Sequence, residues 1–88
     1  MGWRQELELE LELTVADALA GGPASEAGCR LAERNMRAVL DRWLASGRMP
    51  GVKAYHLQVS GGAGLTVDLR FEEHDRVKEV NVDVGKVS

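Results

Sequence analysis

The sequence contains few of the residues on which many functions depend. A single cysteine, Cys29, among 88 residues excludes an internal disulfide and any multi-cysteine metal site, and it is typical of a reducing compartment. The aromatic residues are too few for a platform on which nucleic-acid bases stack, and they are Trp3, Trp43, Tyr55 and Phe71. Lys and Arg number 11 against 14 Asp and Glu, so the chain lacks the basic excess that phosphate binding requires. We therefore expect no nucleic-acid partner.

Long hydrophobic runs are also missing. No apolar stretch approaches the ~18 residues that a membrane span requires. The first six residues show no basic segment followed by an apolar run, which a signal peptide would need. Apolar and charged residues make up 44% and 28% of the chain, as in ordinary globular domains. We expect a cytoplasmic protein of one domain, residues 1–88, with no membrane partner.

A strict alternation of two residue types marks the N-terminal segment. Glu6, Glu8, Glu10 and Glu12 alternate with Leu7, Leu9, Leu11 and Leu13. The intrinsic propensity of both residue types favours a helix. A period of two, however, places all four leucines on one side of a strand, whereas a helix would spread them around its axis. The alternation therefore predicts a half-buried strand over residues 5–15.

The middle of the chain has the spacing of an amphipathic helix. Ser25 is a suitable N-cap, and Gly47 follows the last apolar residue of the segment. Between them the apolar residues recur at i, i+3 and i+4, at Leu31, Ala32, Met36, Val39, Leu40, Trp43 and Leu44. This pattern predicts a helix over residues 25–46.

Three segments in the second half alternate apolar and polar residues, which predicts strands over 52–60, 64–72 and 77–86. The glycine-rich stretch at 61–64 is typical of a hairpin turn, because it leads into a strand and not into a helix that could bind phosphate. The complete order predicts an α+β two-layer sandwich, β-α-β-β-β, with a mainly antiparallel four-stranded sheet on one long helix. The first strand could be a parallel or an antiparallel neighbour in that sheet.

If the apolar residues of each strand face the helix, the alternating polar residues lie on the outer face of the sheet. This arrangement predicts an acidic outer sheet face and a basic outer helix face. Such polarity favours reciprocal pairing of copies, although two solvated faces would satisfy the same pattern. We expect a small non-catalytic interaction module that self-associates through its sheet as a homodimer or higher homo-oligomer, or that binds another protein. The residues expected at this interface are Glu6, Glu8, Glu10, Glu12, His56, Gln58, Asp68 and Arg70.

Residue patterns that would support chemistry are sparse. Neither His56 nor His74 stands in a metal-ligand spacing, so we predict no metal and no cofactor. A nucleophilic Cys29 would need a base, and the sequence does not show whether His56 or His74 lies near it in the fold, so we predict no catalytic residue. A small enzyme or ligand-binding domain that uses sheet carboxylates with His56 is a further alternative, and it would require a concave, partly dry pocket.

The order of a strand, a long helix and a strand meander resembles the cystatin-like fold. Inhibitory cystatins insert an N-terminal glycine, a Gln-x-Val-x-Gly hairpin and a Pro-Trp hairpin into the cleft of a cysteine protease. In this chain Gly2 precedes the predicted first strand, and the segment Gln58–Gly62 matches the Gln and the final Gly of the middle motif. Ser60 stands in place of its Val, and residues 72–75 contain no Pro-Trp. The resemblance implies, as an alternative function, a protease inhibitor that uses Gly2, Gln58, Val59, Ser60, Gly61 and Gly62.

Overall fold

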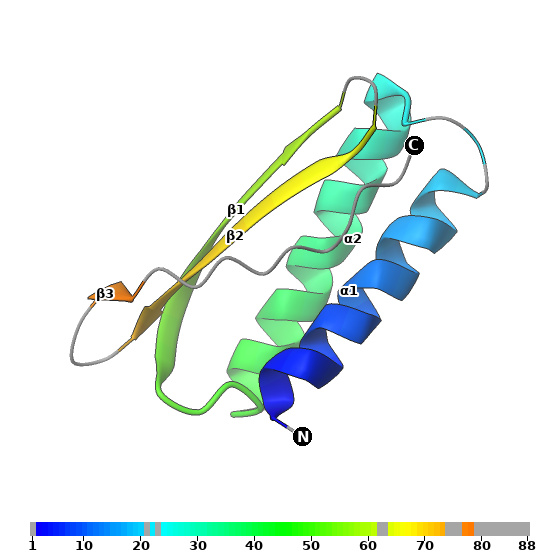
Figure 1. Cartoon of the computed structure of the whole chain (residues 1–88). Helices are drawn as coiled ribbons and strands as arrows, with labels where there is room; N and C mark the ends of the chain where they lie inside the picture. The colour runs from blue at the N-terminus through cyan, green and yellow to red at the C-terminus, as the bar shows by residue number, and fades with distance from the viewer. Residues whose placement is uncertain (1, 21, 23, 62–63, 74–76, 79–88) are drawn as a thin grey trace.

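The computed structural model shows two helices followed by an antiparallel sheet (Figure 1). It describes residues 2–20, 22, 24–61, 64–73 and 77–78. The elements are α1 (Trp3–Leu19), α2 (Glu26–Ala45), β1 (Val52–Ser60), β2 (Thr66–Glu73) and β3 (Val77–Lys78). The strands lie in the order β1-β2-β3, and the two helices run in opposite directions beside each other (Figure 1). The chain is one small α+β domain.

The N-terminal segment is a helix, so the predicted four-stranded sheet on one long helix is wrong. Leu7, Leu11, Val15 and Leu19 recur every fourth residue and are buried along one side of α1. Leu9 and Leu13 belong to a second row and are 56% and 72% exposed. A helix needs only one such row in the core, because residues i and i+4 share a face. The alternation is thus compatible with a helix, and the propensity of leucine and glutamate decides in its favour.

The helix α2 lies where the sequence predicts one. The N–H of Gly28 donates to the Ser25 hydroxyl oxygen over 3.1 Å, which satisfies one of the free donors of the first turn. Cys29, Ala32, Met36, Val39, Leu40 and Trp43 are buried along one stripe. This stripe packs between α1 and the sheet.

The hairpin of β1 and β2 forms the opposite wall of the core. Leu57 on β1 and Val67, Leu69 and Phe71 on β2 are buried, and their neighbours in sequence face away, as strand geometry requires. Of the predicted strand at 77–86, Val77–Lys78 forms β3, and residues 79–86 lie outside the described residues.

The start of α1 is held to the end of β2. The Trp3 ring meets the Phe71 ring edge-on, with 5.6 Å between the centroids. The Arg4 guanidinium donates to the Glu73 carboxylate over 3.1 Å. Both helices therefore cover the same face of the hairpin, and they leave the other face of the sheet and the outer side of the helices uncovered by any other described residue.

Candidate interaction surfaces

The outer face of the sheet brings together four of the predicted interaction residues. His56 lies opposite Arg70, and Gln58 lies opposite Asp68, on adjacent antiparallel strands. Their alternate neighbours are turned into the core, so these four side chains project away from the helices. Three of the four are exposed, and Asp68 is half-buried.

Charges on this sheet face are balanced by neighbours within the chain. The Lys53 ammonium lies 3.4 Å from the Glu72 carboxylate, and the His56 imidazole lies 4.0 Å from the same group. The Arg70 guanidinium lies 3.4 Å from Asp68. The face is therefore polar and mixed in sign, and the predicted acidic sheet side is wrong.

The four predicted glutamates lie on α1, far from that sheet face. Glu10 accepts a hydrogen bond from the Trp43 indole N–H over 2.5 Å and lies 3.7 Å from the Arg42 guanidinium. Glu6 lies 4.0 Å from Arg48. Acids of α1 and arginines at the end of α2 thus share one layer and partly neutralise each other. The remaining two glutamates, Glu8 and Glu12, also lie on α1.

A hollow of about 380 Å³ lies at this end of the helices. It is lined by Glu10, Arg42, Trp43, Ser46 and Arg48. The Arg48 guanidinium stacks over the Trp43 ring at 3.8 Å from the centroid, and Glu10 is engaged by the indole. The polar groups of this hollow have partners within the chain, so its arrangement joins α1 to the end of α2.

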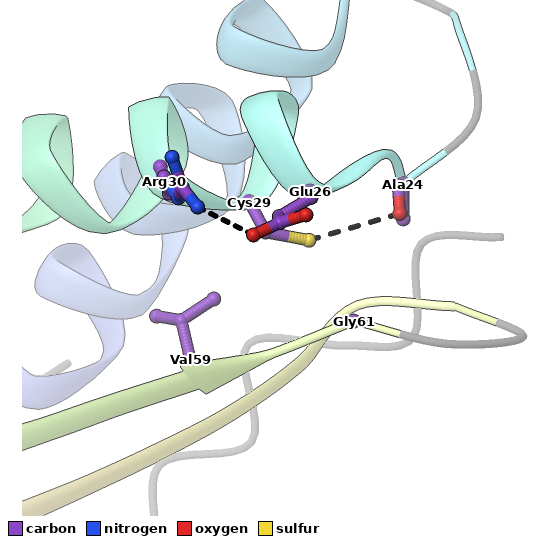
Figure 2. Close-up of a pocket in the computed structure, with 6 residues that line it drawn as sticks. All are labelled: Ala24, Glu26, Cys29, Arg30, Val59 and Gly61. Atoms are coloured by element: carbon purple, nitrogen blue, oxygen red, sulfur yellow. Dashed lines mark hydrogen bonds and ion pairs between the residues drawn. The ribbon is translucent and has the colours of Figure 1, made fainter.

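A second hollow, of about 360 Å³, lies between the start of α2 and the end of β1 (Figure 2). The buried Cys29 thiol points toward the Ala24 carbonyl oxygen at 3.8 Å, and Arg30 forms an ion pair with Glu26. A side chain at Gly61 would place its Cβ 2.6 Å from the Cys29 sulfur. The glycine therefore lets the end of β1 close over the thiol, which is a packing role.

The structure separates the two parts of the predicted inhibitory surface. Gly2 is the N-cap of α1, at the end of the molecule where α2 finishes, whereas the β1–β2 turn lies at the other end (Figure 1). Gln58, Val59 and Ser60 belong to β1, and Gly61 follows that strand. Gly62 lies outside the described residues. The cystatin-like resemblance relied on a first strand that is α1 here.

Strand β1 forms one edge of the described sheet, and α2 covers that edge with side chains. The Arg37 guanidinium donates to the main-chain oxygen of Leu57 over 3.0 Å. The Tyr55 hydroxyl donates to the Asp41 carboxylate over 2.6 Å. Burial, with the hydrogen bond and negative charge of Asp41, raises the pKa of Tyr55 to about 12. This cover hinders pairing of the β1 edge with another strand.

The surface that sequence reasoning missed is the outer face of the two helices, opposite the sheet. Leu9, Leu13 and Leu31 on this surface are 56%, 72% and 44% exposed. We define the outer helix face as a set of exposed residues that recur every third or fourth position. These are Gln5, Leu9, Leu13 and Ala16 on α1, the C-cap Ala20 that follows it, and Ala27, Leu31, Arg34, Ala38, Asp41 and Ala45 on α2. Asp41, in the same row of α2, is bound to Tyr55. The sequence signal for this face is the second leucine row of α1. It separates from the buried row only if the segment is a helix, because in a strand all four leucines would share one side.

Comparison with protein-family models, with curated proteins and with solved structures finds no match for this chain. Within the described residues, no group of three or more His, Cys, Asp or Glu side chains could hold a metal ion. Neither described helix is both long and apolar enough to cross a membrane. The interaction surfaces are therefore interpreted from their own geometry.

Proposed function

We propose that the chain is a small non-catalytic interaction module that associates with copies of itself. The observation that carries this proposal is the outer helix face, where eight of the eleven residues are leucine or alanine and all eleven are exposed. Solvent-facing sides of helices are normally charged or polar. A contiguous apolar surface with a polar rim is typical of a site that another protein covers.

Other surfaces support the proposal less. The outer sheet face is polar, and its charges have neighbours of opposite sign within the chain. The edge of β1 is covered by Arg37 and Asp41 of α2. The inhibitor alternative draws no support from a structure that places Gly2 far from the β1–β2 turn. The enzyme alternative draws none from His56, which lines neither of the two hollows.

The oligomeric state of the whole chain tests the proposal. Sedimentation equilibrium from about 1 μM to about 1 mM should show the mass rising above that of a monomer. The double variant Leu9→Gln/Leu13→Gln should remain monomeric over this range, because it makes the outer helix face polar without entering the core. The control Lys53→Gln/Thr66→Gln changes two exposed residues of the sheet and should associate like the wild type. A monomeric wild type, or unchanged association of the leucine double variant, would overturn the proposal.

A further inference from the structure

We infer that the outer helix face binds the same face of a second copy, with α1 of each chain lying on α2 of the other. This inference rests on the proposed function and adds the geometry of the pair. It requires a two-fold axis parallel to the helices, which gives a closed, isologous dimer with its four helices in the middle.

The distribution of large and small residues fits this arrangement. The contacts of Glu10 with Arg42 and Trp43 show which residues of α1 and α2 lie at the same height along the helix axes. A two-fold axis parallel to the helices leaves this height unchanged, so the same residues lie side by side when α1 of one copy packs on α2 of the other. Leu9 then lies near Ala45 of the second copy, Leu13 near Ala38, and Leu31 near Ala20, each within about half a helical turn. A leucine that meets an alanine packs closely, whereas facing leucines would hold the helices apart.

Charge complementarity favours the same arrangement. Arg34 is exposed in the middle of the α2 part of this face, and it has no ion pair with any described residue. At the same level, the last turn of α1 contains no basic residue, and its carbonyl end carries partial negative charge. Arg34 of the second copy would lie over this turn and beside Asp17.

The alternative two-fold arrangement, with α1 on α1, is electrostatically unfavourable. Glu12 and Asp17 are exposed on α1, and stacking two copies of this helix would bring these carboxylates of the two chains closer together. Placing α1 against α2 instead sets an acidic helix beside one that contains Arg34. Repulsion thus selects between the two stackings of the same apolar face.

The area is sufficient for a specific dimer of modest affinity. Helices of 17 and 20 residues are about 25 and 30 Å long, and packed helices lie about 10 Å apart. The footprint is therefore about 500 Å² on each partner, slightly below the ~600 Å² at the lower end of stable specific interfaces, which is the size expected of a weak dimer.

Intermolecular disulfide trapping distinguishes the two arrangements. In a Cys29→Ala background, a chain with Leu13→Cys is mixed with a chain with Ala38→Cys and mildly oxidised. The mixture should yield a cross-linked heterodimer, and each chain oxidised alone should yield little. Reversal of charge by Arg34→Glu should weaken association about tenfold, because a two-fold dimer contains the contact twice. Lys53→Glu, on the sheet, is the matched control and should leave association unchanged.

The outcomes separate this inference from the proposed function. Cross-linking of the Leu13→Cys chain with itself, or a dimeric mass without any cross-link in the mixture, would overturn the arrangement and leave self-association intact. Unchanged affinity in Arg34→Glu would also count against the arrangement. A monomeric mass of the reduced samples and of the wild type would overturn the proposed function itself.

Discussion

The Tyr55 side chain connects strand β1, at the edge of the sheet, to helix α2. Its hydroxyl donates to Asp41, and the Arg37 guanidinium beside it holds the main chain of the same strand. The phenol is partly withdrawn from water and faces a carboxylate. Both conditions oppose ionisation of the hydroxyl, because the phenolate would be poorly solvated and would repel Asp41.

We predict that Tyr55 titrates near pH 12, well above its ordinary value of 10.0. Tyr55 is the only tyrosine in the chain, so phenolate absorbance reports on it alone. The variant Asp41→Asn should shift the midpoint downward but keep it above 10, because burial is the first cause of the shift. Asp68→Asn, on the other side of the sheet, should leave it unchanged. An ordinary midpoint in the wild type would contradict the Tyr55–Asp41 contact.

The raised pKa of Tyr55 has a defined consequence for stability. Since the folded state favours the protonated phenol, its contribution is fully present below about pH 10 and is lost as the pH rises through about 12. Tyr55→Phe should make the free energy of unfolding less dependent on pH in this window. An equally steep dependence in Tyr55→Phe would assign it to other groups.

Gly61 is a second residue whose role depends on one close approach. We expect Gly61→Ala to lower the free energy of unfolding by about 1–3 kcal/mol, because the new methyl group would lie only 2.6 Å from the Cys29 sulfur. Combining it with Cys29→Ala should recover most of that loss in a double-mutant cycle measured by urea unfolding. The control Gly47→Ala is strained by its backbone φ of +73° and has open space around it, so Cys29→Ala should not rescue it. Equal coupling at both glycines would refute the steric explanation.

At the scale of the element, α1 contains two leucine rows with different surroundings. We expect Leu11→Ala to lower the free energy of unfolding by about 2–5 kcal/mol, because this side chain is fully buried. Leu13→Ala should change it by less than about 0.5 kcal/mol, measured at a concentration where the chain is monomeric. Leu7→Ala and Leu9→Ala form a second matched pair. Equal losses within each pair would indicate that all four leucines face one side, as they would in a strand.

The comparison of these elements shows what the sequence could predict. The segments that became α2, β1 and β2 have apolar spacing that fits one period only, and their locations follow from it. The segment of α1 fits two periods, because residues at every second position include a row at every fourth. A period of two predicts the glutamates on the outer sheet face, whereas the helix places them on α1 and exposes a second leucine row. Long-range contacts such as Glu10 with Trp43 leave no local pattern at all.

At the scale of the whole molecule, the distribution of charge depends on whether the N-terminal segment is a strand or a helix. As a strand, this segment would have made one side of the molecule acidic and the other basic. As a helix, it places Glu6 and Glu10 within reach of Arg48 and Arg42. The exposed surfaces then differ in polarity more than in sign, since the sheet side is polar and the outer helix face is apolar.

The two antiparallel helices place the tryptophans and the cysteine of the chain at opposite ends of the molecule. Trp3, at the start of α1, and Trp43, near the end of α2, lie at one end, and the Cys29 thiol lies at the other (Figure 1). Indole fluorescence therefore reports loss of structure at the first end, and alkylation of the thiol reports exposure at the second. In a fully cooperative monomer the two signals give the same midpoint in denaturant. Early alkylation would instead reveal that the end of β1 separates from the start of α2 while the tryptophans are still packed.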